Sequence, residues 1–296
     1  MNNEALTQFG SNFDDGLFLI GIAILAIEIV KGLFSKSMHR TTFFDMFANV
    51  STQLPFVIMQ VLLFSAIYAT YSVISDSFVT WTIPTTTLTA LLIVLVADLT
   101  YYGEHRFAHE VRLFWTQHAV HHSSRFMNIS VGVRFGPFEG LLSALFHLPL
   151  VLIGFSPELV FFGILIVQAY QTWIHTELVG KLGFIDRILN TPSNHRVHHG
   201  CDEKYIDKNY GGIFIIWDRL FGTYQQEDER PRYGLTRDFD STNPFQVWFS
   251  ELPRLFSDIA AASSLRELQI VLFGKPGRAI VATSNEPRET EAGEKC

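Results

Sequence analysis

Three long apolar stretches constrain the fold of this 296-residue chain more than any other feature. They cover residues 16–34, about 54–74 and about 84–102. A helix needs about 20 predominantly apolar residues to cross the hydrocarbon core of a bilayer. Because a spanning segment must satisfy its own backbone hydrogen bonds, the stretches predict three transmembrane helices in an all-α, integral membrane helical bundle.

Two shorter apolar segments follow, at about residues 138–155 and 158–174, and the motif "GFSPE" joins them. Each is shorter than the first three stretches. The short, proline-containing connection predicts a tight helical hairpin. The sequence leaves open whether these two segments cross the membrane fully.

The composition agrees with a membrane protein, because only 17% of the residues are charged and 48% are hydrophobic. Soluble domains contain about 25% charged residues. The net charge is −7, and we find no basic patch suited to nucleic acid. The composition therefore favours a lipid environment and argues against a nucleic-acid partner.

The positive charges predict the orientation in the membrane. None of the 22 Lys and Arg residues precedes Lys31, and none lies near residue 76 or in the motif "GFSPE". They follow the first stretch, the third stretch and the second short segment. By the positive-inside rule, the N-terminus is outside and the C-terminal part is cytoplasmic, in a bacterial inner membrane or the endoplasmic reticulum. A basic C-terminal domain could inflate this count, but the first two loops agree independently.

The segment "FQVWFSELPRLFSDIA" spaces its apolar residues so that they share one helical face. This spacing predicts a helix that either lies on the membrane surface or packs on the core. The apolar residues are Trp248, Leu252, Leu255, Phe256 and Ile259. The predicted organisation is transmembrane helices in 1–102, a histidine-rich core in 103–240 that includes the hairpin 138–175, an interfacial segment in 241–283 and a disordered tail in 284–296.

Nine of the 11 histidines fall into four groups that follow the third stretch and the second short segment. The motifs are "HRFAH", "HAVHH", "WIH" and "HRVHH", and their spacings place imidazoles on one face of a helix. By the charge argument, all four groups lie on the cytoplasmic side. The nine residues are His105, His109, His118, His121, His122, His175, His195, His198 and His199.

Clustered imidazoles repel one another when charged and need partners when neutral, and a metal ion removes both problems. Nine nitrogens exceed the four ligands of one tetrahedral zinc. They fit two metal ions, each with four or five imidazoles and an open position. Imidazole suits Zn, Cu, Fe and Ni, so the ligand type alone does not choose the metal. We therefore predict a dinuclear metal site in a cytoplasmic helical cap, with His39 and His147 outside it.

Four polar residues near these motifs are candidates for orienting the ligands through their second ring nitrogens. A local capping role or a solvated surface position is the alternative for each of them. The candidates are Asp98, Asp207, Asn209 and Asp218.

The set H-x3-H, H-x2-HH and H-x2-HH, placed after apolar stretches, resembles the fatty acid hydroxylase/sterol desaturase superfamily. The likeness covers about residues 98–236. The motifs "QHAVHHSS", "WIHTELV", "TPSNHRVHHG" and "YIDKNYGGIFIIWDRLFGTY" most resemble its ether-lipid-cleaving branch, in which His175 matches an additional histidine. Gly136 and Asn194 depart from the pattern, since many superfamily members carry histidine at the first position and relatives often carry one at the second.

The resemblance implies a membrane enzyme in which the nine histidines hold two iron ions. It implies an O2-dependent monooxygenase that hydroxylates a C–H bond of a lipid, beside an ether oxygen if the branch carries over. It also implies a separate electron donor: tetrahydrobiopterin, a ferredoxin or a b-type cytochrome. The alternatives are a desaturase or another fatty-acyl hydroxylase and, more remotely, a metal transporter, whose site would lie nearer the middle of the membrane. The sequence leaves the oligomeric state open.

Overall fold

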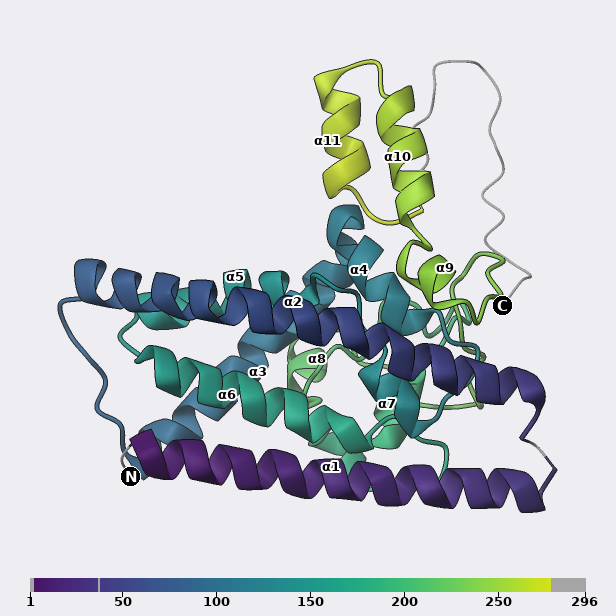
Figure 1. Ribbon diagram of the computed structural model, residues 1–296, viewed down its shortest axis with the longest axis horizontal. Coiled ribbons are helices and arrows are strands. Elements are labelled where there is room, and N and C mark those ends of the chain that lie inside the picture. The colour runs from purple at the N-terminus through teal and green to yellow at the C-terminus, as the bar shows by residue number, and fades with distance from the viewer. Residues whose placement is uncertain (1–2, 37, 278–296) are drawn as a thin grey trace.

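The computed structural model describes residues 3–36 and 38–277, and the fold is all-helical, as predicted (Figure 1). Within these ranges there is no β-strand, and only two isolated antiparallel bridges form, Leu189 with Phe214 and Gly200 with Tyr233. The predicted tail at 284–296, and the end of the predicted interfacial segment, lie outside the described residues.

Three helices are long and apolar enough to cross a membrane: α1 (Asn3–Phe34), α2 (Arg40–Phe78) and α3 (Thr87–Glu110). Thr86 begins α3 with a capping box, in which its hydroxyl accepts from the Thr89 backbone N–H. The helix runs eight residues beyond the predicted end at residue 102, to Glu110. The third apolar stretch and the motif "HRFAH" are therefore one continuous helix.

The predicted hairpin consists of α5 (Glu139–Leu152) and α6 (Pro157–Tyr170). Ser156 caps α6, and Pro157 occupies its first turn, where a missing N–H costs nothing. Each helix has 14 residues and rises about 21 Å, less than the hydrocarbon core of about 30 Å. Gly163 lets α6 approach α3 closely, because a Cβ at this position would lie 2.9 Å from that of Ala97.

The two connections without positive charge lie together at one end of the bundle. The Ile83 N–H donates to the Gly154 carbonyl at 2.8 Å, and the Trp81 indole N–H donates to the Ile153 carbonyl at 3.0 Å. The beginning of α1 lies at the same end (Figure 1). This arrangement is what the positive-inside interpretation requires, whereas the identity of the cytoplasmic face stays a prediction.

Short elements build the histidine-rich region in the half of the molecule away from the N-terminus (Figure 1). The helices are α4 (Arg112–His122), α7 (Pro192–His198) and α8 (Ile216–Phe221), and the 3-10 turns are Ile129–Val133, Gln171–Trp173 and Ile185–Arg187.

The C-terminal region contains α9 (Pro244–Trp248), α10 (Leu252–Ala261) and α11 (Leu265–Phe273). The prediction of one continuous helix over "FQVWFSELPRLFSDIA" is wrong, since α9 and α10 are separate. Pro253 lies in the first turn of α10, and its ring would clash with a helical carbonyl four residues earlier. The predicted apolar face is also divided, because Leu255 is 3% exposed whereas Phe256 is 62% exposed.

Candidate metal centre

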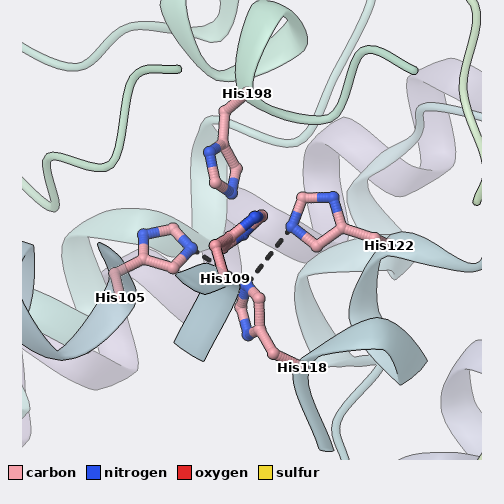
Figure 2. A group of neighbouring side chains, drawn as sticks. All are labelled: His105, His109, His118, His122 and His198. Atoms are coloured by element: carbon pink, nitrogen blue, oxygen red, sulfur yellow. Dashed lines mark hydrogen bonds between the residues drawn. The ribbon is translucent and has the colours of Figure 1, made fainter. Parts of the chain in front are cut away.

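The structure brings the nine predicted histidines together in two groups. Within each group, one ring nitrogen from every histidine lies within 4.8 Å of those from the others. Figure 2 shows the rings of the first group turned toward a common centre. The first group is His105, His109, His118, His122 and His198, and the second is His121, His175, His195 and His199.

Each H-x2-HH motif is divided between the two groups, and the division is reversed between the two helices. In α4, His118 and His122 belong to the first group, while His121 belongs to the second. In "HRVHH", His195 and His199 belong to the second group, and His198 belongs to the first. Residues four apart share a helical face, and the neighbouring residue points about 100° away. One short helix can therefore serve two adjacent sites.

The two groups touch. The rings of His122 and His199 stack with their centroids 4.4 Å apart, and those of His198 and His195 stack with their centroids 5.3 Å apart. Two bound ions would therefore be neighbours.

The second ring nitrogens of several histidines are bound to backbone carbonyls. Since a carbonyl oxygen only accepts, each of these Nδ1 atoms carries the hydrogen, and Nε2 is left as a bare lone pair that faces its group. The pairs are His105 with Tyr210 (2.9 Å), His121 with Arg134 (3.1 Å), His175 with Gln171 (3.0 Å) and His198 with Lys208 (2.9 Å).

The spacing of the bare nitrogens fits bound metal ions. The Nε2 atoms of His121 and His175, both left bare by the carbonyls that hold Nδ1, are 3.2 Å apart. Two lone pairs cannot hydrogen-bond to each other, but metal–nitrogen bonds of about 2.1 Å at right angles place neighbouring ligands about 3.0 Å apart. The Nε2 atoms of His109 and His198 are buried without a hydrogen-bond partner. Each group therefore offers the donor set of a transition-metal site.

Burial keeps these imidazoles neutral. It lowers the pKa of His118 to about 3 and that of His175 to about 4. Burial, followed by repulsion from neighbouring histidines, also lowers the pKa values of five others well below the ordinary value. Neutral imidazole is the form that binds metal, so the site needs little deprotonation at neutral pH. The five are His121, His122, His195, His198 and His199.

Asp98 and Asp218 hold the loop of residues 208–214, which contacts the histidines. Asp98 accepts from the backbone N–H groups of Ile213 (2.6 Å) and Phe214 (3.0 Å) and from the Trp217 indole (2.8 Å). Asp218 accepts from the backbone N–H of Tyr210 at 2.7 Å. This loop carries the carbonyls that hold His105 and His198. The two aspartates thus fix the acceptors of His105 and His198, and in the described residues neither histidine donates to them directly.

The other two candidates differ in their distance from the histidines. Asn209 donates to the Asn194 carbonyl at 3.0 Å and accepts from the Gln225 N–H at 2.8 Å, which joins the loop to α7. Asp207 Oδ1 lies 3.7 Å from His109 Nδ1, beyond hydrogen-bond distance. Of the four candidates, Asp207 alone faces a histidine ring nitrogen in the interactions of the described residues.

Sequence reasoning did not find the partner of His118. Glu139, at the start of α5, accepts from His118 Nδ1 at 3.0 Å. The signal available in the sequence is an acid at the first position of an apolar helix.

Gly136 lies where a larger residue would clash, because a Cβ would lie 2.6 Å from the Gln117 carbonyl oxygen.

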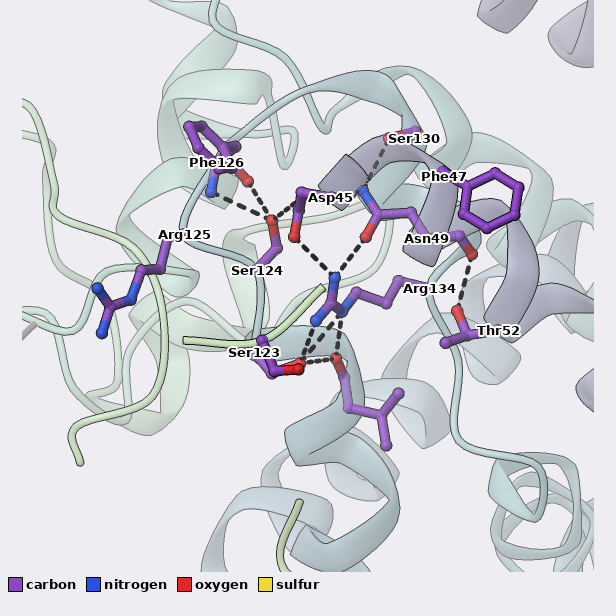
Figure 3. A network of polar contacts seen from close by, with 12 residues as sticks. Asp45, Phe47, Asn49, Thr52, Ser123, Ser124, Arg125, Phe126, Ser130 and Arg134 are labelled. Atoms are coloured by element: carbon purple, nitrogen blue, oxygen red, sulfur yellow. Dashed lines mark hydrogen bonds and ion pairs between the residues drawn. The ribbon is translucent and has the colours of Figure 1, made fainter. Parts of the chain in front are cut away.

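A second feature that the sequence analysis missed is the buried network around Arg134 (Figure 3). Its guanidinium donates to Asp45 Oδ1 (3.0 Å) and Asn49 Oδ1 (2.6 Å) of α2, and to the Val120 carbonyl (2.9 Å) of α4. The carbonyl of the same arginine accepts from His121. Arg134 therefore joins α2 to the second histidine group.

A cavity of about 780 Å³ opens onto the histidines from between α3, α4, α5 and α6. His105, His118, His121 and His175 line one part of it, so both groups are reached. Much of the remaining lining is apolar and includes Leu141, Leu142, Leu145 and Leu165. The lining therefore combines a polar part at the histidines with a larger apolar part, as sites for apolar ligands do.

Residues 90–223 match the family model for fatty acid hydroxylase, and this region contains all nine histidines. The chain carries a fatty acid hydroxylase domain. The sequence resemblance to this superfamily is confirmed.

Curated relatives agree with this assignment. Alkylglycerol monooxygenase of Danio rerio is 36% identical over 257 residues, 86% of this chain and 57% of the relative. Alkylglycerol monooxygenase of Homo sapiens is 41% identical over 202 residues, 67% of this chain and 43% of the relative. Ornithine lipid hydroxylase OlsE of Rhizobium tropici is 37% identical over 134 residues, 44% of this chain and 40% of the relative. The chain spans about half the length of the alkylglycerol monooxygenases. No solved structure matches it.

Proposed function

We propose that this chain is a membrane-bound, O2-dependent lipid monooxygenase with two iron ions, one in each histidine group. The observation that carries the proposal is the meeting of two neutral, converging histidine groups with one apolar cavity. The fatty acid hydroxylase domain supports iron as the metal. Bound iron supplies the chemistry of O2 activation, and the chain supplies ligands, orientation and an enclosure that excludes water.

The proposed ligand assignment follows the two groups, with five imidazoles for one ion and four for the other. Backbone carbonyls fix the rings of His105, His121, His175 and His198, and Glu139 fixes that of His118. These partners hold the donor nitrogens in place before metal arrives, which lowers the entropic cost of binding.

The proposed substrate is a lipid whose alkyl chain occupies the apolar part of the cavity. By analogy with the alkylglycerol monooxygenases, the C–H bond attacked lies beside an ether oxygen. One atom of O2 enters that bond, the other becomes water, and two electrons and two protons are consumed. The resulting hemiacetal breaks into an aldehyde and a glycerol. The electrons come from a separate reductant, for which tetrahydrobiopterin is our first candidate, before a ferredoxin or a b-type cytochrome.

We further propose that residues 103–240 form the catalytic core on the cytoplasmic side of the membrane, with residues 1–102 as its anchor. The helices α10 and α11 would lie on the membrane surface. This placement is supported by large exposed apolar side chains, among them Phe256, Leu265 and Phe273.

The experiment combines metal analysis with product analysis. Metal content of the purified chain is measured by mass spectrometry beside His198→Ala and the control His39→Ala, whose side chain is exposed and outside both groups. We expect about two irons per chain in the wild type and in the control, and a loss in His198→Ala. Incubation with a long-chain alkylglycerol, O2 and each donor should give a fatty aldehyde. Formation of an unsaturated lipid would instead indicate a desaturase, and an unchanged metal content in His198→Ala would contradict the ligand assignment.

A further inference from the structure

Most of the polar side chains that line the cavity already have hydrogen-bond partners. The Tyr101 hydroxyl donates to Gln171 Oε1 at 2.8 Å. Gln117 Oε1 accepts from the Phe138 backbone N–H at 3.1 Å, and Glu139 is bound by His118. These side chains are already hydrogen-bonded within the protein, so they do not require a partner on a bound molecule.

Two acceptors in the same wall are exceptions. Glu104 Oε2 on α3 and Gln53 Oε1 on α2 are buried and have no hydrogen-bond partner. The Glu104 residue is only 9% exposed. The nearest basic group, His147 Nδ1, lies 3.5 Å away and gives its hydrogen to the Ser143 carbonyl at 2.9 Å. Buried acceptors without donors are rare and costly, so each one calls for a partner.

Both acceptors face a cavity that is otherwise largely apolar, which restricts the chemistry of the missing partner. It must donate hydrogen bonds, and it must belong to a molecule that can lie among leucines. A hydroxyl group costs less to bury than an ammonium group, and two hydroxyls on one headgroup can serve acceptors on two helices. A lipid with a diol headgroup meets these conditions.

We propose that Glu104 selects a lipid with hydroxyl groups on its headgroup, by accepting a hydrogen bond from one of them through Oε2. Gln53 provides the second acceptor in the cavity. The inference rests on the proposed function, and it adds the residue that recognises the substrate and the group that is recognised.

The position of Glu104 also selects the carbon that reacts. It immediately precedes His105 of the first histidine group, on the same helix. A headgroup hydroxyl held there lies beside the histidines, while the alkyl chain extends along Leu141 and Leu145 of α5. The headgroup end of the alkyl chain is therefore presented to the metal centre, and the far end of the chain is kept away from it.

The test is a binding competition with a matched pair of lipids, without any reductant. The purified, metal-loaded chain in lipid nanodiscs binds a radiolabelled long-chain alkylglycerol. The competitors are the unlabelled alkylglycerol and its dimethyl ether, which has the same chain and oxygens but no O–H donor. A third competitor, an alkylamine of equal length, tests an ammonium group in place of the hydroxyl.

We expect the wild type to bind the alkylglycerol about tenfold more tightly than the dimethyl ether, since an unpaired buried acceptor costs about one order of magnitude in affinity. Glu104→Met, which fills similar space without an acceptor, should reduce this preference to less than about twofold. Glu104→Gln keeps an acceptor oxygen and should retain most of the preference. Glu158→Met is the matched control, because this acid binds Tyr68 and is not in the cavity wall.

The inference would be overturned if the wild type and Glu104→Met preferred the alkylglycerol over its dimethyl ether to the same extent. It would also be overturned if the alkylamine competed more strongly than the unlabelled alkylglycerol. Glu104→Met should fold, because the oxygen Oε2 that it removes has no hydrogen-bond partner. If this variant loses its metal, the ratio in Glu104→Gln decides, and a preference there below about twofold would overturn the inference. The binding assay needs no turnover, so it separates the two proposals. A preference for the alkylglycerol without aldehyde formation would contradict the proposed function alone. Aldehyde formation without this preference would contradict this inference alone.

Discussion

Asp45 and Arg134 lie 89 residues apart in the sequence and form a buried ion pair at 3.0 Å. The pair joins α2 to the segment whose carbonyl holds His121. The contact connects the long N-terminal helices to the histidine groups, and the two are therefore one structural unit.

Asp45→Ala should destabilise the protein strongly, because it leaves the fully buried Arg134 charge without its acid. Breaking one side of a buried pair costs about 3–5 kcal/mol. Thermal unfolding in detergent, followed by circular dichroism, measures the effect. The control is Asp238→Ala, which removes an exposed partner of Arg125 and should cost less than about 1 kcal/mol. Equal losses in the two variants would contradict the structural role of the pair.

Glu139→Leu should weaken metal binding in the first histidine group, because His118 loses the acceptor that fixes its ring. Loss of such a partner typically lowers metal affinity by about 10- to 100-fold. Glu139→Gln keeps an acceptor oxygen and should bind metal nearly as well as the wild type. The rate of metal loss to a chelator distinguishes the variants, with Glu229→Leu at an exposed position as the control. An identical rate for Glu139→Leu and wild type would refute the prediction.

The metal-free protein should lose stability as the pH falls below about 6.5. In the folded state burial lowers the pKa of His118 to about 3 and that of His175 to about 4, whereas unfolded histidines titrate near 6.5. Between these values the unfolded chain binds more protons, so stability rises with pH there and is complete above 6.5. Each such histidine contributes about 1.4 kcal/mol per pH unit. Unfolding midpoints measured from pH 7.5 to 5, with and without metal, test the sign, and a flat profile for the metal-free form would contradict it.

Gly136→Ala should destabilise the protein by about 1–3 kcal/mol, because the added methyl would lie 2.6 Å from the Gln117 carbonyl oxygen and force a shift of backbone. Gly180→Ala is the control, since nothing lies within 4 Å of a Cβ at that position. Denaturant or thermal unfolding of both variants provides the measurement. A histidine at position 136 should be tolerated even less well. A stable Gly136→Ala protein would show that the backbone yields easily.

The sequence predicted the elements that depend on local periodicity. The apolar stretches form α1, α2 and α3, and the motif "GFSPE" lies at the turn between α5 and α6. The motifs "HAVHH" and "HRVHH" supply six of the nine histidines that lie together. These features depend on helical geometry, which a residue and its near neighbours determine. Pro253 is a local signal from which the break before α10 could also have been predicted.

The features that the sequence did not predict depend on contacts between distant segments. Nothing near Asp45 in the sequence indicates Arg134, and nothing near Asp98 indicates that it binds the N–H of Ile213 in preference to a histidine. The backbone carbonyl of Tyr210 carries no signal in the sequence, yet it sets the tautomer of His105. The division of each H-x2-HH motif between two groups likewise depends on which histidines of other segments pack against it, and only the tertiary structure shows this.

Because of that division, both histidine groups are completed late in the synthesis of the chain. The first histidine group lacks a member until His198 has been synthesised, and the second until His199 has. By then the three long helices and the hairpin have all been synthesised, since they end before residue 171. A metal ion that needs a complete group would therefore bind only after the long helices and the hairpin have been synthesised, and a chain that stalls before residue 198 completes neither group.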